Sequence, residues 1–251
     1  MCSTGQEQSP IDLTVLKGTC EQDMVLDIEW SILSIQTQFI KSDTTINADG
    51  VWGHLFATTV DGNLYGYDGT TLEFHAPAEH TIEGSAYDLE MQFVFTIKNE
   101  FTDYTRNTAI FSILFQIDDS NPVDIFTTID PSKLNTMFTV NMSNIISQYV
   151  QAPIIYYTYD GSWTTPICNE TVNWYVFSSP LGVATTDLAK FTEYWANNMS
   201  FANGKGNNRG LQNLNGRSIM QGGVQCQEQF VYFFSFFILY IFINYFIFKL
   251  L

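Results

Sequence analysis

Short apolar runs separated by turn residues constrain the fold of this chain more than any other feature. Runs rich in Val, Ile, Phe, Tyr and Thr alternate with Gly, Asn and Asp, as in residues 89–99 and 108–118, "LEMQFVFTIKN" and "TAIFSILFQID". Such runs are typical of β-strands, because β-branched and aromatic side chains pack well on a pleated surface. Asp-Gly pairs after Val60 and after Tyr67 add two turn signals. The pattern predicts a mainly-β domain.

Two stretches have apolar residues at helical spacing instead. They cover residues 130–150 and 185–199, and Thr186 or Asp187 is a suitable N-cap for the second. The 251-residue chain is 45% hydrophobic and 16% aromatic, enough for a sizeable core in one domain. We therefore expect an α+β fold dominated by strands, with a few short helices.

The C-terminal segment has a different composition. Residues 230–251, "FVYFFSFFILYIFINYFIFKLL", contain one charged residue, Lys249. A helix of this length spans about 33 Å, against a hydrocarbon core of about 30 Å, so we expect a membrane segment. A permanent span fits, and so does a hydrophobic tail that is cleaved when a lipid (GPI) anchor is attached. The lipid anchor is slightly favoured, because a basic flank is missing and the small residues Gly222 and Gly223 lie upstream. Residues 218–229 would form a polar stalk.

Charge and cysteine content indicate the environment. The formal net charge of −16, from 26 acidic and 10 basic residues, should repel nucleic acids and sulfated polysaccharides. Four cysteines permit disulfides, and N-glycosylation sequons begin at Asn141, Asn169 and Asn198. Since no signal peptide follows Met1, we expect that a leader is missing from the N-terminus. The expected location is the cell surface or a secretory-pathway membrane, with the domain on the extracytoplasmic side.

Four separated motifs resemble α-class carbonic anhydrases and occur in the order of that family. They are "GQEQSPIDL" (5–13), "FHAPAEHTIEG" with "YDLEMQFVF" (74–84 and 87–95), "YDGSWTTPICNETVNWYVFSSPLGV" (159–183) and "NNRGLQNLNGR" (207–217). The resemblance implies that residues 1–217 form one domain with a large, twisted, mostly antiparallel sheet and an active-site cone on one face. It also implies a disulfide between Cys2 and Cys168, whereas Cys20 and Cys226 have no assignment in the family.

The resemblance further implies a set of metal-ligand positions. The family hydrates carbon dioxide with Zn²⁺ held by three neutral imidazoles, which lowers the pKa of a bound water from about 15.7 to about 7. Glu73 and His75 occupy the positions of the His-x-His pair, and Gln92 occupies the third, so two of the three ligands are changed. His80 matches a structural histidine. We expect no tightly bound metal, because Gln92 offers only an amide oxygen; the alternative is zinc, or a different metal, held by Glu73, His75 and Gln92.

The surroundings of these positions match the family better. Thr164 matches the threonine that orients the zinc-bound hydroxide, Glu79 matches the glutamate that accepts its proton, and Thr165 follows as in the family. Glu90 and Asn207 match the groups that support the third and middle ligands. Because a buried hydrogen-bond network can persist for stability alone, these matches support the fold more than catalysis.

Two residues near the site depart from the family or match it loosely. Trp163 replaces the usual leucine, and His54 is a loose match for the proton-shuttle histidine, equally compatible with an ordinary surface histidine. The sequence thus predicts a membrane-anchored, carbonic-anhydrase-like protein that binds a protein or small molecule without normal hydratase activity. The alternative is an active zinc carbonic anhydrase that converts carbon dioxide and bicarbonate with an altered ligand set.

Overall fold

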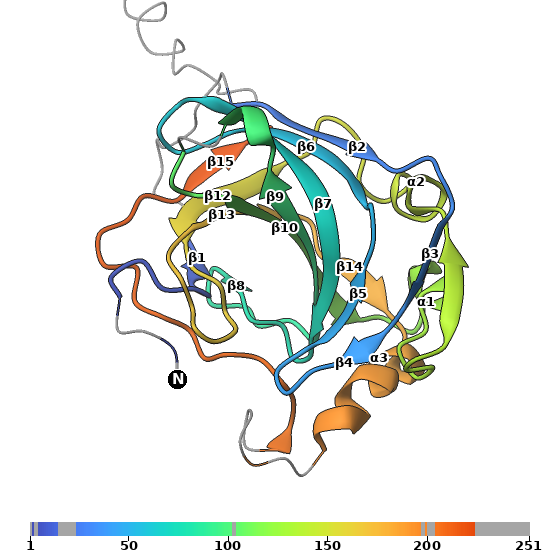
Figure 1. Cartoon of the computed structure of the whole chain (residues 1–251). Helices are drawn as coiled ribbons and strands as arrows, with labels where there is room; N and C mark the ends of the chain where they lie inside the picture. The colour runs from blue at the N-terminus through green and yellow to red at the C-terminus, as the bar shows by residue number, and fades with distance from the viewer. Residues whose placement is uncertain are drawn as a thin grey trace, which may run out of the picture.

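A curled eleven-stranded sheet forms the centre of the molecule (Figure 1). The structure is a computed structural model that describes residues 2, 5–14, 24–101, 104–196, 199 and 204–223. The longest path of neighbouring strands runs through β15 (Met220–Gly222), β12 (Tyr156–Gly161), β13 (Val172–Phe177), β10 (Thr108–Ile117), β9 (Leu89–Ile97), β7 (Leu64–His75), β5 (Ile46–Asp49) and β4 (Ile40–Lys41).

Shorter strands complete the sheet and form two small ones. β6 (Gly53–Thr58) pairs with β7 and with β2 (Leu26–Trp30), and β14 (Leu181–Val183) pairs with β10. The two-stranded sheets join β1 (Asp12–Leu13) to β8 (Thr81–Ile82) and β3 (Ile35–Gln38) to β11 (Met137–Val140). In the large sheet β10 runs parallel to β13 and β14, and the other pairings are antiparallel. The expected mainly-β fold is confirmed, with a mixed sheet.

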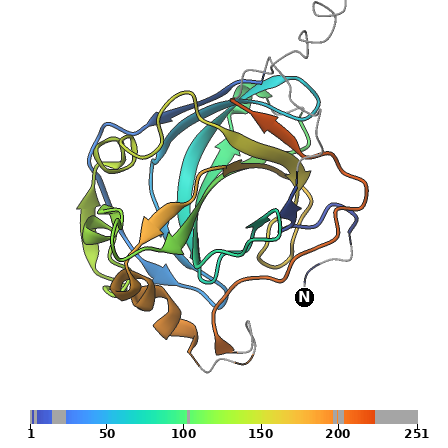
Figure 2. The same cartoon turned by 180° about the vertical axis from the view of Figure 1, so that it is seen from behind.

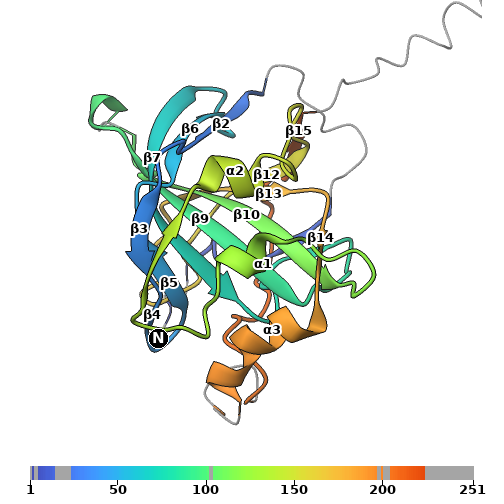
Figure 3. The ribbon, with the colours of Figure 1, turned by 90° about the vertical axis from the view of Figure 1, so that its right-hand side faces the viewer.

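The helices are short, and the α-helices gather along one flank of the molecule (Figures 1 and 2). The helical segments are α1 (Ile125–Thr128), α2 (Met142–Ile146), α3 (Thr185–Thr192) and the 3₁₀ turns η1 (Asn99–Phe101) and η2 (Glu193–Trp195). In the side view of Figure 3, α1 and α2 lie in front of the sheet, and α3 lies at its lower edge. They cover one of its faces and leave the opposite face to the loops.

Each face of the sheet carries its own hydrophobic cluster. Phe74 and Phe93 belong to the larger cluster, which also contains residues of α1, α2 and α3. Val94, Ile110 and Trp174 belong to a smaller cluster on the opposite face. Because neighbouring residues on a strand point to opposite faces, the residues that alternate with Phe74 and Phe93 face the smaller cluster.

The helix expected at residues 185–199 is present as α3 followed by η2, but its first residue differs from expectation. The N-cap is Ala184, not Thr186 or Asp187. Asp119 supplies the cap from another loop, since its carboxylate accepts hydrogen bonds from the Thr185 backbone N–H at 2.7 Å and from the Thr185 hydroxyl at 2.9 Å. A tertiary contact thus fixes the start of this helix.

Two other sequence expectations were wrong. Residues 130–150 do not form one helix, because strand β11 pairs with β3 and only α2 is helical in the second half. The Asp-Gly pair at 68–69 is not a turn but lies inside β7, where the register with β9 shifts between Gly69 and Thr71. The pair at 61–62 does lie in the β6–β7 hairpin, and Gly62 there has a φ of 83°.

The folded domain extends beyond the boundary expected at residue 217, because β15 pairs with β12. Among the described residues, no helix is long and apolar enough to cross a membrane. The predicted anchor at residues 230–251 lies outside the described part of the chain, as do Cys20, Cys226 and Asn198. The expectations about these residues remain predictions.

Candidate functional site

The antiparallel strands β7 and β9 place the three expected ligand positions on one face of the sheet. In their register, Glu73 lies opposite Gln92, and His75 lies opposite Glu90. Side chains two residues apart on a strand point the same way, so these four residues share the face opposite the larger core. The structure therefore brings Glu73, His75 and Gln92 together.

Gln92 uses its amide nitrogen to join two carboxylates. Its Nε2 donates hydrogen bonds to Glu79 Oε2 at 3.1 Å and to Glu90 Oε1 at 2.9 Å. Both N–H groups of the amide are thereby used. The carbonyl oxygen Oε1 is the Gln92 atom left to contact a ligand.

His75 is 1% exposed and has one ring nitrogen without a partner. Its Nδ1 lies 3.4 Å from Glu79 Oε1 and 3.5 Å from the Asn207 carbonyl oxygen. Its Nε2 is buried and, in the described structure, forms no hydrogen bond. Because a buried polar atom without a partner costs about 1–3 kcal/mol, Nε2 is a candidate contact atom for a ligand.

Asn207 holds the end of β7 that carries His75. Its Oδ1 accepts a hydrogen bond from the Ala76 backbone N–H at 2.9 Å. Its Nδ2 donates to the backbone carbonyls of Phe74 and Thr44, each at 3.0 Å. Asn207 is therefore a positioning residue for β7.

Glu90 is a fully buried carboxylate with many donors. Its Oε2 accepts from the backbone N–H groups of Glu79 and His80 at 2.9 Å, and its Oε1 accepts from Ser112 Oγ at 2.7 Å. His80 Nδ1 also lies 2.9 Å from Oε1. Burial alone would raise the pKa of Glu90, but the attraction of His80 and these hydrogen bonds outweigh burial and hold that pKa well below its usual value. Glu90 is therefore ionised.

The network continues from His80 to the N-terminal segment. His80 Nε2 lies 2.7 Å from the Tyr159 hydroxyl oxygen, and Tyr159 donates to Ser9 Oγ at 2.9 Å. Ser9 Oγ also accepts from the Ser162 backbone N–H at 3.0 Å. His80 thus lies between a strand carboxylate and a tyrosine, and both of its ring nitrogens are occupied by these contacts, which fits a structural role.

Thr164 and Glu79, the expected orienting pair, are both buried but are not joined. Glu79 Oε1 accepts from the Arg209 backbone N–H at 2.9 Å, while the described structure shows no hydrogen bond from the Thr164 hydroxyl to this carboxylate. Thr165 follows Thr164 in the loop after β12. Trp163 is partly buried and packs against the smaller hydrophobic cluster, which lies on the same side of the sheet as the ligand positions.

Acidic groups dominate the electrostatics of the ligand positions. Burial raises the pKa of Glu73, and although His75 lowers it, Glu79 and Asp49 raise it further. Three carboxyl groups, from Glu73, Glu79 and Glu90, therefore lie near two imidazoles, with Glu79 beside His75 and Glu90 beside His80. This arrangement differs greatly from three neutral imidazoles.

His54 lies apart from these residues. It is on β6, and its Nδ1 is 2.6 Å from Asp68 Oδ1 on β7, with both side chains about half exposed. Asp68 precedes Glu73 by five residues, which corresponds to roughly 15 Å along an extended strand. The structure does not bring His54 to the ligand positions, so its position adds no support to the proton-shuttle hypothesis.

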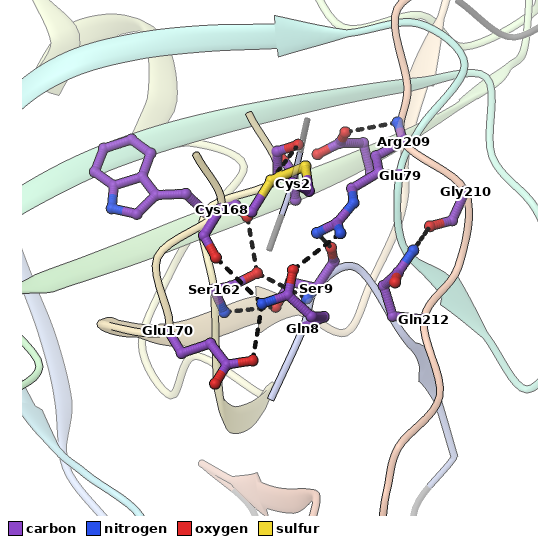
Figure 4. Close-up of a disulfide and its surroundings, with 12 residues drawn as sticks. Cys2, Gln8, Ser9, Glu79, Ser162, Cys168, Glu170, Arg209, Gly210 and Gln212 are labelled. Carbon is purple, nitrogen blue, oxygen red and sulfur yellow. Dashed lines mark hydrogen bonds between the residues drawn. A yellow bond between two sulfur atoms is a disulfide. The ribbon is translucent and has the colours of Figure 1, made fainter. Parts of the chain in front are cut away.

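The disulfide implied by the resemblance is present between Cys2 and Cys168 (Figure 4). Gln8 Nε2 donates to the Cys168 carbonyl at 3.2 Å and to Glu170 Oε1 at 2.8 Å, and Arg209 Nη2 donates to Gln8 Oε1 at 2.9 Å. These contacts join the N-terminal motif, the threonine loop and the C-terminal motif at one end of the site.

Sequence reasoning missed several members of the network, among them Ser112, Tyr159 and Arg209. Tyr159 and Arg209 lie within the family-like motifs at 159–183 and 207–217, which was a usable signal. The sequence signal for Ser112 was weaker, because it is only a single hydroxyl-bearing residue within an apolar strand. It faces the site because it pairs with Gln92 across β9 and β10.

Two of the three sequon asparagines lie in the described structure. Asn141 caps α2 by accepting from the Asn144 backbone N–H at 3.1 Å, and it donates to the Ile32 carbonyl at 2.7 Å. Asn169 is exposed, beside the disulfide at Cys168. Glycosylation at either position stays a prediction.

Solved structures share this curled sheet and define the class of protein. The α-carbonic anhydrase from Thermovibrio ammonificans, in complex with the inhibitor sulfanilamide, is 27% identical, with a TM-score of 0.63 over 86% of this chain and 87% of that one. Dioscorin complexed with ascorbate, at 23% identity, shows the same fold with a TM-score of 0.69 over 89% and 88% of the two chains.

Sequence comparison identifies the family. The carbonic anhydrase of Pectobacterium carotovorum is 28% identical over 227 residues, 88% of this chain and 82% of the relative. Alpha carbonic anhydrase 6 of Arabidopsis thaliana is 30% identical over 182 residues, 70% of this chain and 64% of the relative. The family model for eukaryotic-type carbonic anhydrase matches residues 1–222, and the chain belongs to this family.

Proposed function

We propose that this carbonic anhydrase family member is a binding protein without normal zinc-dependent hydratase activity. The observation that carries the proposal is the donor set on the shared face of β7 and β9. It consists of one carboxylate, one imidazole and one amide, from Glu73, His75 and Gln92. The amide nitrogen is already bonded to Glu79 and Glu90.

These residues do not fit the zinc centre that the family uses. That centre needs three neutral imidazoles, which keep the positive charge of the metal available to acidify its water. A carboxylate at Glu73 would reduce this charge, and the Gln92 amide oxygen is a weak ligand. Among the described residues, no group of three His, Cys, Asp or Glu side chains is placed to hold a metal. We therefore assign no catalytic step to a metal here.

A second candidate function is supported by the free nitrogen of His75. Its Nε2 is buried and unpaired in the described structure, which is the state expected of an atom that meets a ligand. Together with the Gln92 carbonyl oxygen and Glu73, it could hold Zn²⁺ or another divalent ion through mixed nitrogen and oxygen donors. In that case the protein would be a carbonic anhydrase with an altered ligand set, acting on carbon dioxide and bicarbonate.

The proposal includes an anchored, extracytoplasmic protein. Residues 230–251 would attach the domain to a membrane, either as a span or as the signal for a lipid anchor, and the sequons suit a secretory route. The net charge of −16 disfavours nucleic acids as partners and leaves proteins or small molecules.

Elemental analysis of the purified chain, paired with a carbon dioxide hydration assay, distinguishes the two functions. We expect zinc well below one equivalent and no sulfonamide-sensitive hydration. One equivalent of zinc with sulfonamide-sensitive activity would refute the binding-protein proposal and establish the altered-ligand enzyme.

Restoring the imidazoles provides a positive control for this assay. The double variant Glu73→His/Gln92→His should bind one equivalent of zinc, whereas each single variant should bind less. Hydration activity in the double variant would show that only the ligands are missing. If zinc binds without activity, the triple variant that adds Trp163→Leu tests whether the indole beside the site blocks the reaction.

A further inference from the structure

Strand β2 exposes one edge of the large sheet. Among the described strands it pairs with β6 alone. Val25 O accepts from the Thr58 N–H at 2.9 Å, and the Ser31 N–H donates to Trp52 O at 3.1 Å. In an antiparallel pair, alternate residues direct their N–H and C=O groups to the partner strand.

This alternation fixes which backbone groups face outward. Residues 25, 27, 29 and 31 bond to β6, so the N–H and C=O groups of Leu26, Ile28 and Trp30 point to the open edge. No hydrogen bond to these groups is found within the described residues. These three residues therefore present a row of unpaired backbone N–H and C=O groups, with which the backbone of an added strand can form hydrogen bonds.

The side chains of β2 have a two-sided pattern. Leu26, Ile28 and Trp30 are only partly buried and pack at the margin of the larger core, with the Trp30 ring centroid 4.7 Å from that of Phe93. Asp27 and Glu29 are exposed on the other face. A strand added beside β2 would therefore meet apolar neighbours on one face and carboxylates on the other.

An apolar cavity of about 410 Å³ lies at the C-terminal end of β2. Ile32, Leu33 and Val51 line it, with exposed fractions of 76%, 72% and 67%, beside Glu29 and His54. Three neighbouring aliphatic side chains this exposed are unusual on the surface of a soluble domain, and they offer a site for a bulky apolar side chain.

We propose that β2 is a docking edge for an extended segment of a partner protein in which apolar and basic residues alternate. The apolar residues extend the core beside Leu26, Ile28 and Trp30, the basic residues pair with Asp27 and Glu29, and a terminal apolar residue enters the cavity. This inference goes beyond the proposed function and does not depend on whether the Glu73–His75–Gln92 site is active.

Electrostatic repulsion disfavours a second copy of this chain as the partner that binds the β2 edge. An antiparallel β2–β2 pair would bring Asp27 and Glu29 close to their own counterparts, and like charges across a strand pair are destabilising. The net charge of −16 adds long-range repulsion between copies and attraction for a basic segment.

The test uses two synthetic peptides with the full chain. One alternates valine and lysine and ends in phenylalanine, and the other has glutamate in place of each lysine. Fluorescence anisotropy measures affinity, and amide hydrogen exchange locates the bound peptide. We expect the lysine peptide to bind and to protect the amides of Leu26, Ile28 and Trp30, and the glutamate peptide not to bind.

Charge-reversal variants make the test specific. The double variant Asp27→Lys/Glu29→Lys should lower the affinity for the lysine peptide by about tenfold or more. It should also allow the glutamate peptide to bind. The control Asp43→Lys/Glu193→Lys changes the net charge equally at exposed sites and should alter affinity by less than about twofold. Similarly, Leu33→Asp should weaken binding, whereas Ile117→Asp, at an exposed position on β10, should not.

Several outcomes of the peptide experiment would overturn the proposal. They are failure of the lysine peptide to bind the intact chain, equal binding of both peptides, and protection at amides outside β2. Equal effects of the two double reversals would likewise show that net charge, rather than the β2 edge, governs binding.

Discussion

Removing one hydroxyl group from each of two buried tyrosines should destabilise the domain at one position and not at the other. Tyr156 and Tyr159 lie on β12, and both are 0% exposed. The Tyr159 hydroxyl contacts His80 Nε2 and Ser9 Oγ, whereas the Tyr156 hydroxyl forms no hydrogen bond in the described structure. Tyr→Phe at either position removes the same atom, so the difference between the variants isolates the hydrogen bonds.

The magnitudes follow from the partners that each substitution leaves behind. Tyr159→Phe leaves His80 Nε2 and Ser9 Oγ without this contact in the interior, at about 1–3 kcal/mol for each group that stays unsatisfied. We expect a net loss of about 2 kcal/mol in the free energy of unfolding, or roughly 4–8 °C in Tm for a domain of this size. Tyr156→Phe removes a buried hydroxyl that has no partner, so stability should stay unchanged or rise by up to about 1 kcal/mol.

Urea unfolding followed by circular dichroism, supported by thermal melts, measures both variants against the parent chain. Equal slopes of unfolding free energy against urea concentration would show that the parent and both variants expose similar surface areas when they unfold. The reasoning would be refuted if Tyr156→Phe destabilised the domain as much as Tyr159→Phe. The chain from Glu90 to Ser9 would then contribute nothing specific to the fold.

Three further predictions concern the same face of the sheet. Asn207→Ala should lower the free energy of unfolding by about 2–4 kcal/mol in urea titrations, because three backbone groups lose their partner. The pKa of Glu90 in the folded state is lowered to about 2, so the ionised carboxylate contributes fully to folding stability above its unfolded pKa of about 4.3. This contribution should be lost as pH falls through about 2. The urea midpoints of the parent chain and of Glu90→Gln should therefore converge in acid. Burial raises the pKa of Glu73, so Glu73→Gln should raise the urea midpoint at pH 7, and this gain should shrink as pH falls and the parent carboxyl becomes protonated.

The sequence predicted features that follow from local pattern or from the family-like motifs. The apolar runs became β9 and β10, and the motifs implied the pairing of Cys2 with Cys168. The errors arose where distant contacts decide local structure. Residues 137–140 became a strand because β3 lies beside them, and Asp119 set the start of α3 from another loop.

The hydrogen bonds of the site were harder to predict than its members. Family matching placed Thr164 and Glu79 as a bonded pair, but the Glu79 carboxylate bonds to Arg209 and Gln92 instead. Side-chain partners depend on small rotations that one-dimensional spacing does not encode. The gathering of Glu73 and Gln92, in contrast, follows from strand register and could be predicted.

Gln92 holds two carboxylates of the site together through its side-chain amide. In a zinc-holding member of the family, two positive charges balance the acidic groups that surround the ligands. Here the two N–H groups of one amide bond to Glu79 and Glu90 at the same time, and a neutral imidazole has only one N–H to offer. Gln92 therefore joins two buried carboxylates that would otherwise repel each other, and it does so with hydrogen bonds inside the protein.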